Sequence, residues 1–150
     1  MILTQKSPTV TDVLNQVLHL LLRGLPAYVV EANPWTEPRW QALRKALANL
    51  ADDRRLFANR AAQAILDRGD YPDPGPFPLE YTGLNDVSIA YLTQETIHSL
   101  HIDIEVLPEL SAQLATIPHL RDLTEEILGN TIAHAEILEK MQNEECRMQS

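Results

Sequence analysis

The chain has 150 residues, of which 45% are hydrophobic, and it carries a formal net charge of −9 with 12 Lys and Arg residues. This length and apolar content predict one folded domain with its own core and exclude an intrinsically disordered chain. The negative field repels phosphate groups, so we expect neither nucleic acid nor an anionic membrane as a partner, and the single Cys146 excludes an internal disulfide.

The first predicted helix begins at Ser7-Pro8, which reads as an N-cap followed by proline at the first helical position. Its apolar residues recur every three or four positions, and Gly24 and Pro26 should kink or break it. The most apolar stretch, residues 17–22, is too short to span a bilayer. No basic segment leads into an apolar run at the N-terminus, so we expect a soluble cytoplasmic protein.

Three further segments have helical periodicity. The second runs from about Thr36 to Gly69, and it places Arg54 near the middle of its apolar stripe and Asp53 at the edge of that stripe. The third runs from about Leu84 to Ile117, with Pro108 as an expected kink. The fourth runs from about His119 to Met141 and is followed by a polar tail, residues 142–150, which we expect to be flexible.

The link between the second and third helices, residues 69–83, contains Pro72, Pro74, Pro76 and Pro78 and should be extended. Fifteen extended residues reach about 45–50 Å. A helix of about 32 residues is about 48 Å long, so this link can run the whole length of a bundle. The sequence therefore predicts an all-α, single-domain four-helix bundle with a long Pro-rich crossover and parallel second and third helices. The alternative is a loose surface loop.

A buried polar layer is predicted at mid-bundle. If the second and third helices are parallel, Arg54, Asp103 and His134 lie at similar levels along their helices. A buried arginine needs a carboxylate, so we expect Arg54 to pair with Asp103 or Asp53, with a further hydrogen bond to His134. The layer is either a structural device that fixes helix register, which we favour, or the wall of a substrate or anion pocket.

The stretch QETIHSLHIDIE, residues 94–105, contains the spacing E-x-x-H at Glu95 and His98. This spacing is used by metal-binding helical bundles, so Glu95, His98 and His134 are the candidate metal ligands. Helical periodicity nevertheless places Glu95 and His98 away from the core stripe of this segment. We therefore favour a solvated or interface face, shared with Tyr91 and Ile102, over a metal site in the core.

At IAHAEILEKM, residues 132–141, the chain resembles the last helix of rubrerythrins and bacterioferritins, which are ferritin-like four-helix bundles that hold two iron ions. The resemblance implies that His134 matches the final histidine of the family's ligand set. Thr131 stands where that motif has a glutamate. The remaining family positions fall near Asp52 and Arg55, near Glu95, and near His19, so the resemblance implies a degenerate di-iron motif.

The leading hypothesis is a ferritin-like bundle with a degenerate metal site that works as a small-ligand, weak metal-binding or interaction module. One alternative is an iron-dependent oxidoreductase with an altered ligand set around Glu95, His98 and His134, in which iron or another divalent metal is the cofactor. The other alternative is a structural subunit that dimerises through the Tyr91, His98 and Ile102 face. We expect a homo-oligomer, with a small ligand as a further partner.

Overall fold

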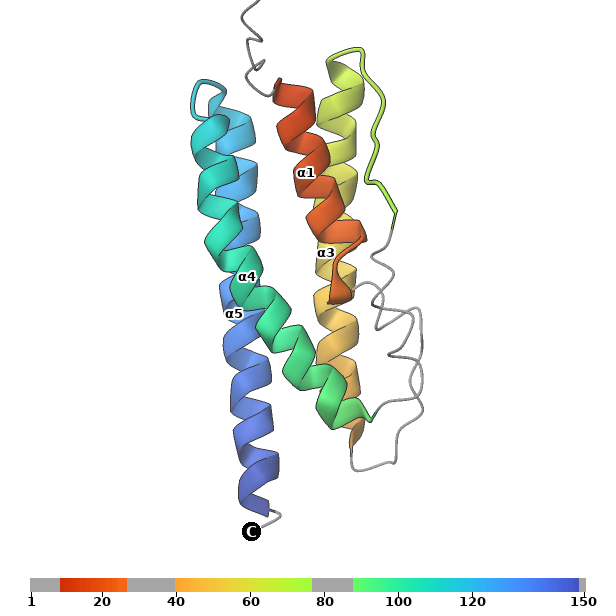
Figure 1. Cartoon of the computed structure of the whole chain (residues 1–150), viewed down its shortest axis with the longest axis vertical. Helices are drawn as coiled ribbons and strands as arrows, with labels where there is room; N and C mark the ends of the chain where they lie inside the picture. Colours follow the sequence, from red (N-terminus) through yellow and green to blue (C-terminus); the bar gives the residue numbers. More distant parts are fainter. Residues whose placement is uncertain (1–8, 27–39, 77–87, 149–150) are drawn as a thin grey trace, which may run out of the picture.

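The computed structural model describes residues 9–26, 40–76 and 88–148. Within these ranges the chain forms four helices: α1 (Val10–Leu22), α3 (Gln41–Asp67), α4 (Ile89–Gln113) and α5 (Pro118–Met148). Figure 1 shows them side by side in one bundle. The predicted all-α four-helix bundle is confirmed.

The direction of the helices agrees with the predicted crossover. Figure 1 shows α3 and α4 rising together, while α1 and α5 descend. After α3, residues 70–76 turn back and run beside α1 (Figure 1). Hydrogen bonds between the two segments show that they run in the same direction. Thr11 donates to Asp70, Asn15 accepts from the Asp73 amide at 2.8 Å, and Arg23 Nε donates to the Gly75 carbonyl at 2.6 Å. The rest of the predicted crossover, from residue 77, lies outside the described residues.

The first helix begins two residues later than predicted. Thr9 is its N-cap: the Thr9 hydroxyl accepts from the Asp12 amide, and the Asp12 carboxylate accepts from the Thr9 amide, forming a capping box. Ser7 lies outside the described residues. The helix ends at Leu22, just before Gly24, as the sequence predicts.

The other helix ends confirm one local signal, the glycine after α3, and correct two predicted boundaries. The chain leaves α3 through Gly69, whose φ of 82° favours glycine, and the Gly69 and Asp70 amides bond to the Leu66 and Ile65 carbonyls in a Schellman motif. The predicted end of the third helix at Ile117 is wrong, because α4 ends at Gln113. The predicted end of the fourth helix at Met141 is also wrong, because α5 continues to Met148 and includes most of the segment predicted to be a tail. The predicted starts of the second and third helices, residues 36 and 84, lie outside the described residues.

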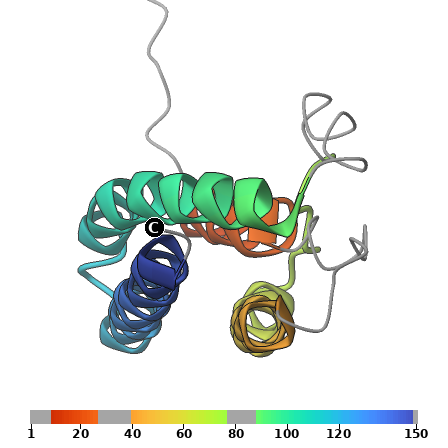
Figure 2. The same cartoon turned by 90° about the horizontal axis from the view of Figure 1, so that it is seen from below.

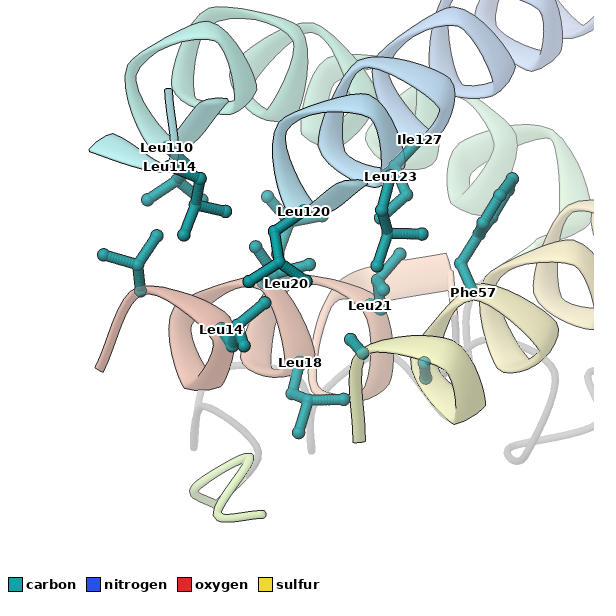
Figure 3. Close-up of a cluster of buried hydrophobic side chains, with 14 of the residues drawn as sticks. Leu14, Leu18, Leu20, Leu21, Phe57, Leu110, Leu114, Leu120, Leu123 and Ile127 are labelled. Atoms are coloured by element: carbon teal, nitrogen blue, oxygen red, sulfur yellow. The ribbon is translucent and has the colours of Figure 1, made fainter. Parts of the chain in front are cut away.

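The core has an upper and a lower part. The upper cluster is formed by α1, the second half of α3, the second half of α4 and the first half of α5 (Figure 3). Because α1 is short, the lower cluster is built mainly from the first half of α3, the first half of α4 and the second half of α5. Figure 2, seen from below, shows α3 and α5 on the same side of α4, which passes from α5 toward α3. Arg54 follows Leu50 of the lower cluster and precedes Phe57 of the upper one, so it sits between the two apolar clusters.

Pro108 lies inside α4 and does not end it. Proline lacks the amide that would bond to the carbonyl four residues earlier, which bends a helix. Figure 1 shows α4 changing direction in its middle, so that its first half crosses toward α3 while its second half lies along α5.

Candidate functional site

A buried arginine ties three helices together at mid-bundle. The Arg54 side chain is 2% exposed, and its Nη2 donates to Asp103 Oδ2 on α4 at 3.0 Å. Its Nη1 donates to the carbonyl of Leu20 at 3.1 Å. Leu20 lies in the last turn of α1, where carbonyls lack intrahelical partners, so Arg54 caps the C-terminus of α1 with a positive charge.

Burial dominates the electrostatics of this pair. It lowers the pKa of Arg54 and raises the pKa of Asp103, and the attraction between the two groups opposes both shifts. Arginine nevertheless stays protonated in proteins, so the pair is ionic. The Arg54 Nε is buried and has no hydrogen-bond partner among the described residues.

A second polar cluster joins α3 to α5. His134 Nε2 donates to Asp53 Oδ2 at 2.7 Å, and Asn130 Nδ2 donates to the same oxygen at 3.0 Å. The hydrogen bonds from Asn130 and His134 lower the pKa of Asp53. The His134 side chain is 12% exposed, while that of Asp53 is 40% exposed, so this cluster opens to solvent at one side.

The predicted three-residue layer is thus two separate pairs. Arg54 is buried and bonded to Asp103, as expected, but His134 bonds to Asp53 and not to either member of that pair. His134 lies at the edge of the buried stripe of α5, and Thr131 and Ala135 are the buried residues in its place. Buried Thr131 is accommodated because its hydroxyl donates to the Ile127 carbonyl at 2.8 Å.

A groove of about 380 Å³ lies between α1 and α4, directly beside the arginine pair. We call it the α1/α4 groove. Its lining is Gln16, His19, Leu20, Arg23, Gly24, Ser99, Ile102, Asp103, Val106 and Leu110. Gly24 has no room for a side chain, because a Cβ there would lie 2.5 Å from the Leu20 carbonyl oxygen that accepts from Arg54.

The candidate metal ligands do not come together. Glu95 is half-buried and His98 is exposed on α4, whereas His134 on α5 is engaged with Asp53 on α3. Within residues 9–26, 40–76 and 88–148, no group of three or more His, Cys, Asp or Glu side chains is arranged to hold a metal ion. Among the described residues, Glu95, His98 and His134 therefore do not form a group of three ligands, and their role as metal ligands stays a prediction.

The other positions implied by the ferritin-like resemblance also have different partners. His19 Nδ1 donates to the Pro74 carbonyl at 2.7 Å, so it holds residues 70–76 against α1. Asp52 and Arg55 form an exposed ion pair with each other at 3.5 Å. Thr131 bonds to its own helix. None of these side chains is directed to a shared cation by the contacts that the structure describes.

The α1/α4 groove and the role of the Leu20 carbonyl were not predicted from the sequence. The role of the Leu20 carbonyl could have been predicted from the sequence. Gly24 ends α1, so the Leu20 carbonyl lacks an intrahelical partner at the level of the buried Arg54 guanidinium. No periodicity in the sequence reports the groove, which depends on how far α4 leans away from α1.

The chain matches no family model and none of the curated proteins with which it was compared. None of the helices in the described part of the chain is long and apolar enough to cross a membrane.

Proposed function

We propose that this protein is a ferritin-like helical bundle that works as a small-ligand-binding module, with its ligand in the α1/α4 groove. The parallel direction of α3 and α4 supports the ferritin-like connection (Figure 1). The middle of the bundle holds the Arg54–Asp103 ion pair, whose positive member disfavours a divalent cation there. A binding role therefore accounts for the geometry better than di-iron chemistry does.

The observation that carries this proposal is the position of Asp103. Its carboxylate is bonded to a buried arginine, yet the same residue lines the α1/α4 groove, and its side chain is 14% exposed. The volume of the groove lies within the range of about 300–1,000 Å³ that is typical of ligand pockets. Apolar walls with a few fixed polar groups are the usual composition of such sites.

The test is a fragment screen followed by two-dimensional ¹H–¹⁵N NMR on the full chain. Fragments that bind in the groove should shift amide signals of Leu20, Ser99 and Val106, and a Ser99→Trp variant should abolish these shifts by filling the groove. Glu105→Trp, at an exposed α4 position outside the groove lining, is the matched control and should leave them intact. A screen in which no fragment moves the groove signals would reject the proposal.

A second candidate function is self-association through the outer face of α4. Tyr91 and Ile102 are 44% and 49% exposed, and His98 between them is also exposed. Bulky exposed residues on one helix face are typical of an interface. Analytical ultracentrifugation of the wild type and of Tyr91→Glu tests this idea: a dimer that becomes a monomer supports it, and a wild-type monomer at high concentration rejects it.

A further inference from the structure

We propose that the ligand of the α1/α4 groove is a neutral, largely apolar molecule whose single hydroxyl or N–H group donates a hydrogen bond to Oδ1 of Asp103. This inference rests on the proposed binding role of the groove and names the ligand class.

The first argument is an open acceptor at the floor of the groove. Asp103 Oδ2 accepts from Arg54 Nη2 at 3.0 Å, and none of the described residues donates a hydrogen bond to Oδ1. Oδ1 is not one of the buried side-chain atoms without a partner, and the Asp103 side chain is 14% exposed, so this oxygen retains solvent access. A carboxylate oxygen can only accept, so the ligand group that meets it must be a donor.

The second argument is the charge balance around that oxygen. Arg54 and Asp103 neutralise each other, so the pair offers no net charge to a charged ligand. A charged ligand would lose hydration on entering the groove without gaining a counter-charge from this pair. A neutral donor satisfies Oδ1 without that cost.

The third argument is the character of the walls. Leu20 is buried in the floor, and Ile102, Val106 and Leu110 form the α4 side of the groove. Half of the Ile102 side chain remains exposed, so a molecule in the groove would remove apolar surface of the protein from water. Burial also raises the pKa of Asp103, which makes its carboxylate a stronger acceptor than an exposed one.

The experiment uses four single-ring probes that differ in one substituent: phenol, toluene, benzoate and benzylammonium. Dissociation constants are measured by ¹H–¹⁵N NMR titration of the full chain near pH 7, where phenol is neutral. Phenol should bind about ten-fold more tightly than toluene, as expected for a hydrogen bond to a charged acceptor. Benzoate and benzylammonium should both bind more weakly than phenol.

The outcomes separate the ligand class from the binding role. If the four probes move the Leu20, Ser99 and Val106 signals with similar constants, or if a charged probe binds best, the groove binds ligands but the neutral-donor class is wrong. If no probe moves these signals, or if Ser99→Trp leaves the shifts unchanged, the groove is not the site and both proposals fail.

A variant adds an independent readout. Asp103→Asn keeps the shape of the side chain but removes its charge, so the preference for phenol over toluene should fall several-fold. Should this variant not fold, because it leaves Arg54 buried without its counter-charge, the comparison of phenol with toluene on the wild type still decides the proposal.

Discussion

Asp53 and Arg54 are consecutive residues of α3, yet they bond to different helices: Asp53 to His134 on α5, and Arg54 to Asp103 on α4. Successive side chains point about 100° apart around a helix, so one dipeptide reaches two neighbours. Together the two pairs fix the rotation and the axial level of α3 against both partners. A polar register device of this kind is what the sequence analysis favoured for Arg54.

Removing Arg54 should be strongly destabilising. Arg54→Ala strands the buried Asp103 carboxylate, frees the Leu20 carbonyl and leaves a cavity, so the free energy of unfolding should fall by about 3–5 kcal/mol. Arg54→Met fills the space and should cost somewhat less. Denaturant melts measure both, and a loss below about 1 kcal/mol in both variants would mean that Arg54 does not bear this role. The control is Arg55→Met, an exposed position whose loss should be within about 0.5 kcal/mol.

Replacing both members of the buried pair should restore much of this loss. A well-packed apolar pair avoids the desolvation cost of two charges, so Arg54→Met combined with Asp103→Leu should be more stable than Arg54→Met alone by at least about 1 kcal/mol. The measurement is a double-mutant cycle from denaturant melts. Additive losses in the two single variants would show that the charges are not coupled.

The stabilisation by Asp53 should depend on pH. The pKa of Asp53 in the folded protein lies below its ordinary value of 3.8, because Asn130 and His134 donate to its carboxylate. A carboxyl group with a lowered folded pKa stabilises the fold above its unfolded pKa, and this contribution is lost as the pH falls through the folded pKa. The stability difference between the wild type and Asp53→Asn should therefore be constant near neutral pH and shrink below about pH 4. Urea melts across this range check the trend, and a difference that grows on acidification would reverse the assignment.

The burial of Arg54 was predictable because one charged residue interrupts a long apolar stripe, and its pairing with Asp103 followed from the levels of two parallel helices. The hydrogen-bond partner of His134 could not be predicted in this way. Periodicity locates a face only within some tens of degrees, so His134 was expected in the buried layer although Thr131 is the more deeply buried residue. The Thr131 hydroxyl bonds to its own helix, so this residue can be buried at the centre of the stripe and displaces His134 toward α3.

The length of α5 was underestimated for a related reason. Residues 142–148 are polar, which led to the prediction of a flexible tail, but Glu, Gln, Met and Arg have high helix propensities and no proline or glycine interrupts them. A helix that has already formed extends at low cost, so this segment continues α5 to Met148. The α1/α4 groove could not be predicted from the sequence because it depends on how α4 lies against α1, which periodicity does not report.

The end of α1 offers a sharp test of the Arg54 cap. A Cβ at position 24 would lie 2.5 Å from the Leu20 carbonyl oxygen, so Gly24→Ala must displace the group that accepts from Arg54. Forcing a backbone shift of this kind costs about 1–3 kcal/mol. The matched control is Gly129→Ala: Gly129 lies inside α5, and a Cβ added there would meet nothing within 4 Å, so alanine should stabilise the helix by about 0.5–1 kcal/mol. Thermal and denaturant melts of the two variants should therefore move in opposite directions. If Gly24→Ala stabilises the protein as Gly129→Ala does, the end of α1 is not held against Arg54.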